Sequence, residues 1–555
     1  MLLSNLDLLA TAPGGVARLR ELILTLAVQG KLVPQDPADE PASALLQKIR
    51  AEKDRLIAEG KSKRDKPLAE IAEEEKPFAL PQGWEWVRFG DVALISSGVT
   101  LGRKTAIPSP IMLPYLRVAN VQRWHVNLTA IKEVVIDRTE LARFQLVNGD
   151  LLITEGGDWD KVGRTAIWRD ELPTCLHQNH VFKVRGTSPE WSPLWAQLFL
   201  NSPVARAYFA FSAKQTTNLA SINMTELKHC VFPLPPLAEQ SRIVTRVDAL
   251  MRLCDALEAK GRLEAAQHAQ LVSTLLGALT ASTTPEELAE NWQRVAQHFD
   301  LLAGRPEAID ALEQTLLQLA VRGLLVPQDP TDEPASVLLK KIRAEKDRLI
   351  AAGQIKRDKP LPPITDEEKP FALPVGWEWV RFGDASINRD GERIPVSSSD
   401  RENRAKTYDY YGASGVIDKI DGFLFDKTLL LIGEDGANLI NRSTPIAFLA
   451  HGKYWVNNHA HVIDTTHPEL MTYLALFINA ISLEPYVTGT AQPKMNQAKL
   501  NSIVIGLPPL PEQTRIVTRV TALRRLCADL RQRLAEREAV QARLAEALVH
   551  EVSLA

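Results

Sequence analysis

Short clusters of arginine, lysine, asparagine and glutamine occur in the first half of this 555-residue sequence. Arginine and the side-chain amides can bond bidentately to the edges of guanine and adenine, and the cationic side chains bind phosphates. The clusters lie in segments 98–105, 115–123 and 149–164, and the candidate contacts are Arg103, Lys104, Arg117, Asn120, Arg123, Lys161 and Arg164. We expect these side chains to bind nucleic acid. For the glycine-bounded segment 98–105, a solvated surface loop is the competing interpretation.

Paired histidines and paired acids invite a metal-based interpretation, but their spacing does not support one. A zinc site needs further protein ligands at suitable spacing, and a metal-dependent nuclease needs clustered carboxylates around its metal ions. Neither pattern accompanies these pairs, which are His177/His180, His459/His461, Asp150/Glu155 and Glu434/Asp435. We interpret the histidines as hydrogen-bonded strand residues and the acids as groups that order loops. No metal site is therefore predicted.

Motifs for nucleotide-driven or methyl-transfer chemistry are missing from the sequence. A translocase would carry the GxxxxGK[ST] loop, whose backbone cradles nucleotide phosphates. An adenine methyltransferase would carry a glycine-rich cofactor loop after a strand and an acceptor loop of the NPPY or DPPY type, and neither is present. We therefore expect a binding protein that is not an enzyme by itself.

The composition is that of a globular protein with little net charge. The formal net charge is −3, which argues against coating nucleic acid by charge alone, because domains that do so are strongly basic. No apolar run approaches the roughly 18 residues of a membrane span, and the N-terminus lacks the basic region of a signal peptide. The four cysteines form neither a metal pair nor a disulfide framework. We expect a cytoplasmic, reduced protein with about three to five structural units.

The elements that must position the polar clusters occur twice. Residues 19–91 align without a gap with residues 312–384, and both contain VPQDP, KIRAEKDRLIA and GWEWVRFGD. Residues 234–254 align in the same way with residues 507–527. We call these duplicated segments the frames. Such self-similarity indicates one structural unit used twice.

The inserts between the frames, residues 92–230 and 385–503, have diverged. They differ in length and share little beyond a final Asn-x-x-x-Leu, which is Asn223/Leu227 in the first and Asn496/Leu500 in the second. The first insert is basic and the second is slightly acidic. A fixed scaffold with two diverged inserts predicts two independent binding domains. A plain duplication with neutral drift is the alternative, but drift should have eroded the frames as well.

Hydrophobic spacing predicts helices throughout the frames. Helices are expected at 17–29 and 40–59 and at their copies, 310–322 and 333–352. Two apolar stripes that follow Pro-Pro then step by four and three, which is the a/d seam of a coiled coil. Their residues are Ile243, Val247, Leu250, Cys254 and Leu257 in the first, and Ile516, Val520, Leu523, Cys527 and Leu530 in the second, which Leu534 extends. Two matched stripes can pair antiparallel, with one insert at each end.

The combination of these motifs resembles the specificity subunit of a type I DNA restriction–modification enzyme. The matching features are LPxGWxWxxFGD before each insert, Asn-x-x-x-Leu and LPPLxEQxRIVxRV at its end, the heptad helices and the two-fold repeat. The resemblance implies two globular, mixed α/β target-recognition domains joined by two long helical regions that form an intramolecular antiparallel coiled coil. It also implies that each domain reads one half of a bipartite, asymmetric DNA site and that the coil sets the spacer.

The resemblance implies further contacts, partners and cofactors. In this family, segments similar to KQTT and to its counterpart in the second insert lie close to DNA, which adds Lys214, Gln215, Thr216, Thr217, Thr490, Gln492, Lys494 and Asn496. The implied partners are double-stranded DNA, two adenine-N6 methyltransferase (M) subunits and translocase–nuclease (R) subunits of an anti-phage restriction system. Those subunits would use S-adenosylmethionine, ATP and magnesium, with no cofactor bound by this chain.

The implied domain boundaries follow the repeat. They are an N-terminal helical region and linker at 1–76, a first target-recognition domain at 77–236, a central helical region at 237–369, a second target-recognition domain at 370–509 and a C-terminal helix at 510–555. Two other functions remain open. A coiled-coil scaffold that binds proteins in another anti-phage complex would use the same frames, and a self-sufficient nuclease would need the metal site that the sequence lacks.

Overall fold

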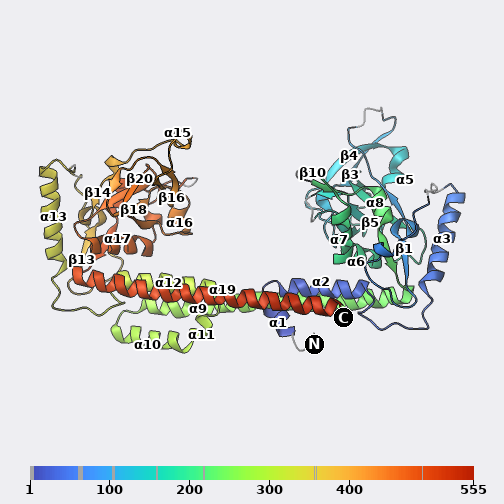
Figure 1. Ribbon diagram of the computed structural model, residues 1–555, viewed down its shortest axis with the longest axis horizontal. Coiled ribbons are helices and arrows are strands. Elements are labelled where there is room, and N and C mark those ends of the chain that lie inside the picture. The colour runs from blue at the N-terminus through green and yellow to red at the C-terminus, as the bar shows by residue number, and fades with distance from the viewer. Residues whose placement is uncertain are drawn as a thin grey trace. The chain divides into compact units, whose positions relative to one another are not determined.

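The computed structural model describes residues 6–60, 67–102, 107–157, 161–216, 219–355, 357, 359–489 and 492–554. The chain divides into two compact units, Met1–Leu263 with Glu538–Ala555, and Glu264–Arg537. Figure 1 labels the elements, and each unit is described by itself. The two long helices, α9 (Leu237–Ala281) and α19 (Leu510–Leu554), each contribute one part to both units. None of the described helices is long and apolar enough to cross a membrane.

In each unit, the beginning of one long helix packs with the end of the other. The first unit joins the start of α9, the end of α19 and helix α2 (Gly15–Val28) in one core, which contains Leu19, Ile23, Ile243, Val247, Cys254, Ala545 and Leu548. The second unit joins the end of α9, the start of α19 and helix α12 (Pro306–Val321), with Val272, Leu276, Leu312, Leu316, Cys527 and Leu534 in the core. The long helices therefore run antiparallel, as predicted.

Both predicted seams are buried or half-buried along their length. Ile243, Val247, Ile516 and Val520 are nearly fully buried, and Leu250, Leu257, Leu523 and Leu530 pack at the margins of the same cores. The structure adds a third helix to each pair of long-helix segments, and the sequence did not predict this packing. Because α2 or α12 packs on each seam, each half of the coil is a three-helix bundle.

The remaining frame helices confirm the predicted positions to within a few residues. The second predicted helix is α3 (Ala42–Ala58), and its copy is α13 (Ala335–Ala351). The repeat also begins earlier than we aligned it, since α1 (Leu6–Thr11) and α11 (Phe299–Leu302) share the letters DLLA and each buries a leucine, Leu9 or Leu302. Helix α10 (Pro285–Gln297) has no matching helix in the described part of the first copy.

The first insert forms three sheets, and a frame strand pair closes it. The pair is antiparallel and consists of β1 (Glu85–Arg88) and β12 (Val231–Leu234), so the insert starts and ends at one place. The main sheet has the order β2 (Ala93–Ser96), β9 (Val181–Gly186), β5 (Leu151–Thr154), β7 (Thr165–Ile167). A second sheet has the order β4 (Lys132–Asp137), β3 (Pro110–Leu116), β8 (Leu176–His177), and β3 and β8 are parallel. The third has the order β10 (Lys214–Thr216), β11 (Leu219–Ser221), β6 (Gly156–Gly157).

The second insert repeats this plan with different residues. Its closing pair is β13 (Glu378–Arg381) with β22 (Val504–Leu507). The main sheet has the order β14 (Ile387–Asn388), β21 (Ala460–Asp464), β18 (Leu429–Gly433), β19 (Ala447–Ala450). The other sheet has the order β16 (Gly415–Ile420), β15 (Tyr408–Gly412), β20 (Lys453–Val456), β17 (Phe425–Asp426), and β15 and β20 are parallel. Two inserts with little common sequence therefore share a mixed α/β fold.

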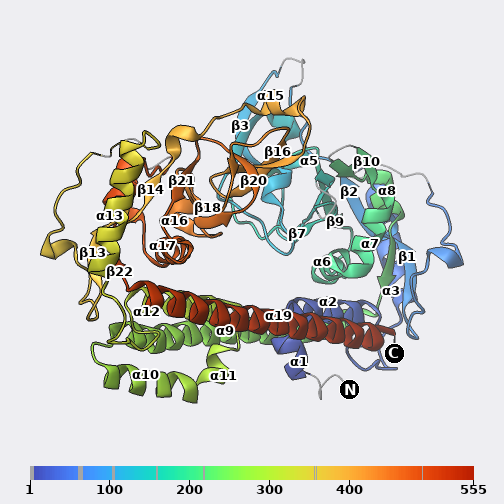
Figure 2. The same cartoon turned by 60° about the vertical axis from the view of Figure 1, so that its left-hand side comes forward.

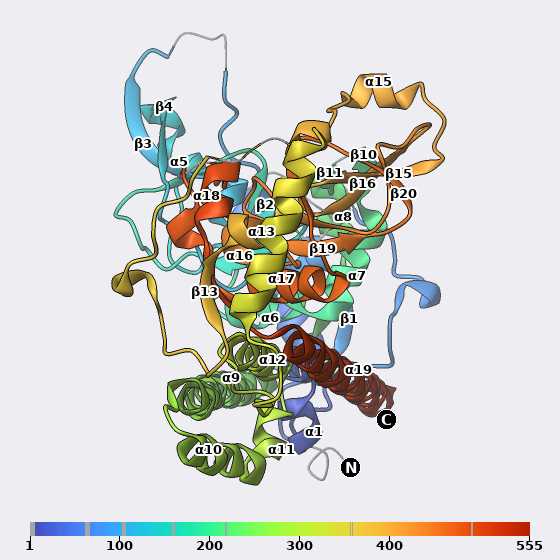
Figure 3. The same cartoon turned by 90° about the vertical axis from the view of Figure 1, so that its left-hand side faces the viewer.

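Helices join each insert to its frame. In the first unit α6 (Pro193–Asn201) and α7 (Pro203–Ser212) pack on α2 (Figure 2). In the second unit the single helix α17 (Pro468–Ala480) lies between the main sheet and α12 (Figure 3). The short helices are α4 (Phe89–Val92), α5 (Leu141–Phe144), α8 (Met224–His229), α14 (Phe382–Ala385), α15 (Ser398–Glu402), α16 (Asn438–Asn441) and α18 (Gln497–Ser502).

The repeated motifs of each frame meet in one buried polar socket. In the first copy the glutamate of LPPLxEQ, Glu239, accepts hydrogen bonds from Trp84 Nε1 at 2.9 Å and from Gln35 Nε2 at 3.2 Å. Burial raises the pKa of this carboxyl above its ordinary value, and the two donors counteract the shift. In the second copy Glu512 accepts from Trp377 and Gln328 at the same two distances. The socket explains why VPQDP, PxGW and LPPLxEQ are repeated together.

The shared Asn-x-x-x-Leu motif is a helix start. The side-chain oxygens of Asn223 and Asn496 accept from the backbone N–H of Glu226 and Lys499 and so cap α8 and α18. An asparagine at this position satisfies a backbone donor that the first helical turn leaves unpaired. The leucines, Leu227 and Leu500, are fully buried. The motif therefore fixes the turn that leads into the closing strand of each insert.

Candidate nucleic-acid interface

Two predicted contact segments of the first insert, distant in sequence, meet in the sheet β10-β11-β6. Ala220 of β11 pairs with Gly157 of β6, and β11 also pairs with β10, where Lys214 lies opposite Ser221. Lys214 is exposed. On the other side of the sheet, Lys161 lies so close to Gly157 that a Cβ there would be 2.8 Å from the Lys161 Cβ. The structure thus brings two lysines of the predicted set to the two opposite edges of one small sheet.

The third predicted segment of the first insert reaches the same neighbourhood through Arg123 and Gln122. Arg164 Nη1 donates to Gln122 Oε1 at 2.8 Å, which ties segment 115–123 to the loop before β7. Arg123 Nη1 lies 3.4 Å from Asn201 Oδ1, and Asn201 in turn donates to the carbonyl of Thr165 in β7. Arg123 and Arg164 therefore lie at neighbouring positions beside one strand.

Arg117 and Asn120 do not belong to this surface. Asn120 is 3% exposed, and its side chain accepts from the Arg117 backbone N–H and donates to the carbonyls of Asn127 and Ala130. Arg117 Nη2 also donates to the carbonyl of Ala130, at 3.1 Å. Both side chains order the loop after β3, so we correct their assignment and leave them out of the interface.

Some predicted contacts fall on parts of the chain that the structure does not describe. Arg103, Lys104, Thr217 and Thr490 lie outside the described residues. Gln215 and Thr216 are described as members of strand β10, without their side chains.

In the second insert the predicted contacts lie on a tight turn that takes the place of the hairpin β10–β11. The backbones of Thr488 and Lys494 exchange both hydrogen bonds, at 2.9 and 2.8 Å. Lys494 Nζ lies 3.3 Å from Glu434 Oε1 with about half of its side chain exposed, and Gln492 on the same turn is exposed. Asn496 uses its side-chain oxygen as the cap of α18, so it holds this turn against the helix. Asn496 is itself exposed, and its contact with DNA stays a prediction.

Both interfaces share a pairing of acid and histidine that the sequence showed only as separate motifs. His180 Nδ1 lies 2.6 Å from Glu155 Oε2, and His459 Nδ1 lies 2.7 Å from Asp435 Oδ2. A carboxylate that accepts from Nδ1–H fixes the ring orientation and leaves Nε2 on the far side. About half of each histidine side chain is exposed.

The backbone around these pairs is the same in both inserts. The N–H of Glu155 donates to the carbonyl of His180, as the N–H of Glu434 does to that of His459. The signal that could have found these histidines is the repeated Gln/Asn-Asn-His, at 178–180 and 457–459. The sequence had led us to interpret these histidines as hydrogen-bonded strand residues, without a role in the interface.

The two inner histidines are buried strand residues with different surroundings. His177 Nδ1 donates to the carbonyl of Val181 at 2.7 Å, and its Nε2 has no hydrogen-bond partner. Burial lowers the pKa of His177 to about 3, so this ring is neutral. His461 instead lies 2.6 Å from Asp390 Oδ2 and 2.8 Å from the carbonyl of Met495. Among the described residues, no three histidine, cysteine or acidic side chains form a group that could hold a metal ion.

The candidate nuclease acids are occupied by partners within the fold. Asp150 is fully buried and accepts two hydrogen bonds from Arg185, both at 2.6 Å. Glu434 accepts from Arg393 at 2.9 Å and faces Lys494. Each acid thus neutralises a nearby cation and orders a loop.

Several acids of the second insert are held in internal ion pairs. Arg401 and Lys406 donate to Asp418 and hold the pKa of its carboxyl well below the usual range. Arg389 and Lys427 both bind Asp464, each at 2.7 Å. Because these acids are paired away from the Thr488–Lys494 turn, the net charge of the insert does not describe the charge at its candidate interface.

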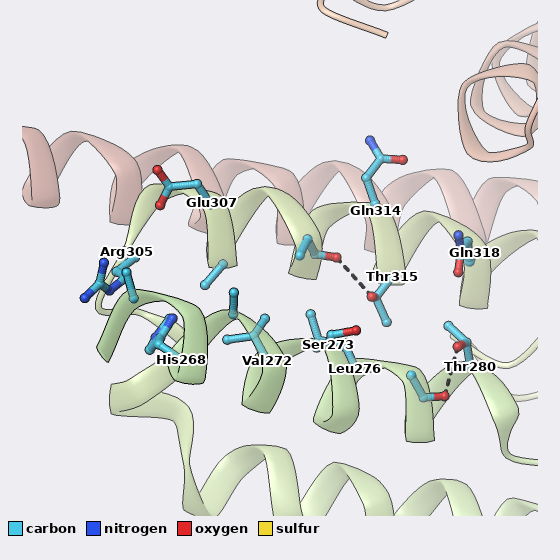
Figure 4. Close-up of a pocket in the computed structure, with 15 residues that line it drawn as sticks. His268, Val272, Ser273, Leu276, Thr280, Arg305, Glu307, Gln314, Thr315 and Gln318 are labelled. Carbon is cyan, nitrogen blue, oxygen red and sulfur yellow. Dashed lines mark hydrogen bonds between the residues drawn. The ribbon is translucent and has the colours of Figure 1, made fainter. Parts of the chain in front are cut away.

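A groove between α9 and α12 in the second unit, of about 600 Å³, carries no comparable chemistry (Figure 4). Its walls combine small apolar residues, including Ala269, Gly277, Ala308 and Ala311, with polar ones, including His268, Arg305, Glu307 and Gln314. Thr315 donates to the carbonyl of Ala311 and Thr280 to that of Gly277, so both hydroxyls serve their own helices. None of the described residues that we predicted to bind nucleic acid lines this groove.

Comparison with known proteins agrees with the duplicated frame and the two-domain plan. The family model described as type I restriction modification DNA specificity domain matches twice, at residues 81–268 and 374–537, which is more than half of the chain. The chain belongs to this family of type I restriction–modification DNA specificity proteins.

Two relatives match nearly the whole length of this chain. The specificity subunits of the type I restriction enzymes EcoEI and EcoAI, both from Escherichia coli, are each 35% identical to this chain over 96% of its length and 93% of theirs. A chain from a solved structure of a type I R-M system is 19% identical, with a TM-score of 0.47, over 86% of this chain and 99% of that chain.

Proposed function

We propose that this chain gives a type I restriction–modification complex its DNA sequence specificity, with each insert domain reading one half of a bipartite, asymmetric DNA site. The observation that carries the proposal is the repetition of one sheet plan in two inserts of different sequence. A common scaffold with different side chains at the same edge suits two related ligands, such as two short duplex sequences. Phosphate contacts would position each domain and base-edge contacts would specify the sequence.

The proposed contacts are the side chains at the two edges. They are Arg123, Lys161, Arg164, Lys214 and His180 in the first domain and Gln492, Lys494 and His459 in the second, together with the predicted residues outside the described parts. Gln492 and Lys494 carry the donors and acceptors that read base edges in the major groove. The half-exposed histidines add a ring nitrogen that can donate to a phosphate or accept from a base.

The long helices are proposed to set the unread spacer between the half-sites. Each spans 45 residues, about 68 Å at 1.5 Å per residue, and half-sites one helical turn apart are about 34–36 Å from centre to centre. The frames would also bind two M subunits at pseudo-equivalent positions, and R subunits would join that complex. Methyl transfer, translocation and cleavage, with S-adenosylmethionine, ATP and magnesium, would then belong to those partners, and this chain would be non-catalytic.

The test is an exchange of one insert. Replacing residues 92–230 with the corresponding insert of a relative, and mapping methylated adenines on host DNA in cells that carry the M subunit, should change one half of the site only. The reciprocal exchange of residues 385–503 is the matched control and should change the other half. A change in both halves, or in neither, would contradict independent reading. Methylation that does not depend on either insert would favour the alternative of a protein-binding scaffold.

A further inference from the structure

The duplicated frames give this chain two sockets whose chemistry is the same. The Trp–Glu–Gln contacts have equal lengths in both copies, as described above. A second repeated ion pair, Arg242–Asp39 in the first copy and Arg515–Asp332 in the second, also measures 2.6 Å in both. A segment of one copy could therefore make these contacts equally well with the other copy. Identical elements of this kind can be exchanged between two chains, which is domain swapping.

One set of ion pairs in the three-helix bundles differs between the two copies. We call it the charge layer. In the first unit Arg20 of α2 lies 2.6 Å from Asp255 and 3.4 Å from Glu258, both on α9. Arg20 is also within 3.8 Å of Met251 Sδ. The basic partner here is on the short frame helix, and the acidic partners are on the long helix.

The second unit has the same layer with the signs reversed. Glu313 of α12 accepts from Arg524 at 2.7 Å and from Arg531 at 2.6 Å, both on α19. Asp310, one turn earlier on α12, also pairs with Arg531, at 2.7 Å. Burial raises the pKa of the Glu313 carboxyl, but the two guanidinium donors outweigh it, and the pKa lies below the ordinary value.

The reversal falls on aligned positions of the repeat. Arg20 aligns with Glu313 in the gap-free match of the first frame segments. Continued along the long helices, the second match aligns Glu258 with Arg531. Two positions that contact each other have therefore both changed sign between copies whose socket contacts are unchanged. A single change would have broken the ion pair, whereas the reciprocal change preserves it.

We propose that this reversed charge layer makes α2 pair with the start of α9 and α12 pair with the start of α19. It disfavours the crossed pairings of α2 with the start of α19 and of α12 with the start of α9, above all with a second molecule of this chain. In a crossed arrangement Arg20 would face Arg524 and Arg531. Glu313 would likewise face Asp255 and Glu258. The side chains of Arg20 and Glu313 are 27% and 12% exposed, and those of their partners on the long helices are 34–68% exposed. Like charges held together at such a site repel more strongly than in water, and specificity between similar partners depends on such repulsion.

A neighbouring contact strengthens the same preference. Arg18 of α2 donates to the carbonyl of Ala542 at 2.7 Å and lies 3.6 Å from Glu546 on the end of α19. The position aligned with Arg18 in the second copy is Ala311, which can make neither contact. The reversed layer thus carries the repulsion, and Arg18 adds attraction to the correct pairing.

The deciding variant keeps the ion pair and removes the discrimination. R20E/D255R/E258R gives the first unit the signs of the second, so the charged side chains attract own and crossed pairings alike and only the Arg18 contacts still favour the own pairing. The full-length variant should unfold at nearly the wild-type temperature. After refolding from denaturant at high protein concentration, it should contain at least tenfold more domain-swapped dimer than wild type, measured by size-exclusion chromatography with light scattering.

Two further variants complete the experiment. E313R/R524E/R531E makes the equivalent change in the second unit and should give the same excess of dimer. E52R/R55E reverses an exposed ion pair within the single helix α3, where the two side chains lie 2.6 Å apart, and should refold like wild type. Wild-type dimer content in both test variants would overturn the proposal. Failure of both to fold would also overturn it, because the proposal requires each unit to tolerate either sign order.

Discussion

The two insert domains share a closing strand pair and a four-stranded main sheet but build their candidate DNA-binding edges in different ways. In the first, two extra strands, β10 and β11, extend the edge at β6. In the second, a tight turn closed by Thr488 and Lys494 takes that place. The shared parts are those that connect to the frame, and the unlike parts are those that face outward. The difference shows that the frame constrains the strand pair at which an insert begins and ends. It does not constrain the structure of the candidate DNA-binding edge.

The largest expected effect concerns the closing strand pair of each insert. It tests whether the two domains depend equally on the buried leucine beside that pair. Leu227→Ala and Leu500→Ala each remove a fully buried side chain beside the closing strand. Each should lower the free energy of unfolding of its own domain by about 2–5 kcal/mol, because the change combines lost burial with a cavity. Urea denaturation followed by hydrogen exchange of peptides from β12 and β22 separates the two domains. A large loss in one domain and none in the other would break the equivalence.

A smaller effect should distinguish the domains by their buried histidines. The pKa of His177 is about 3 in the folded chain against an ordinary value of 6.5, so the unfolded chain binds the proton first. The contribution of neutral His177 to the stability of the first domain is therefore fully present above pH 6.5 and is lost as the pH falls from 6.5 towards 3. At pH 5 the loss should be about 2 kcal/mol.

The measurement is urea denaturation at pH 8 and pH 5, read by hydrogen exchange of β5 and β9 peptides with intrinsic rates corrected for pH. His177→Gln keeps a donor for the carbonyl of Val181 but cannot take up the proton. This variant should lose most of the pH dependence of the first domain. An unchanged dependence would show that another group is responsible.

The smallest effects concern recognition and would sharpen the comparison of the edges. Lys494→Ala or Gln492→Ala should weaken binding to the second half-site by about 1–3 kcal/mol if the contact is to a base edge. Lys214→Ala is the matched change in the first domain. Affinity measured on DNA with one half-site altered at a time should show each loss in one half only. If Lys494 contacts a phosphate instead, the loss should be uniform across sequences and should reduce the salt dependence.

The frames could be predicted because their signals are local and occur twice. The heptad steps from Ile243 to Leu257 required a buried stripe, and the matched second stripe predicted antiparallel pairing. The third helix in each bundle was not predicted, because the hydrophobic face of α2 does not identify its partner. The sockets were not predicted either, since Gln35, Trp84 and Glu239 are far apart in sequence.

The candidate sites were harder to predict because composition does not show the direction of a side chain. Asn120 and Lys161 both lie in polar segments, but Asn120 is buried in its own loop and Lys161 lies by a sheet edge. The acid–histidine pairs needed the sheet order, which places His180 beside Glu155 across two strands that are 25 residues apart. The separate motifs were visible in the sequence, and only the fold joined them.

The antiparallel pairing of β1 with β12, and of β13 with β22, has a consequence for the gene. Since each insert begins and ends at a single strand pair, it can be replaced by any segment that supplies the same closing strand and the cap before it. Because the frames are so similar in amino-acid sequence, we expect the DNA that encodes them to be similar enough for homologous recombination inside one gene. Such events would reassort, delete or add whole recognition domains while leaving every socket intact, so new specificities can arise without a stepwise change of any contact.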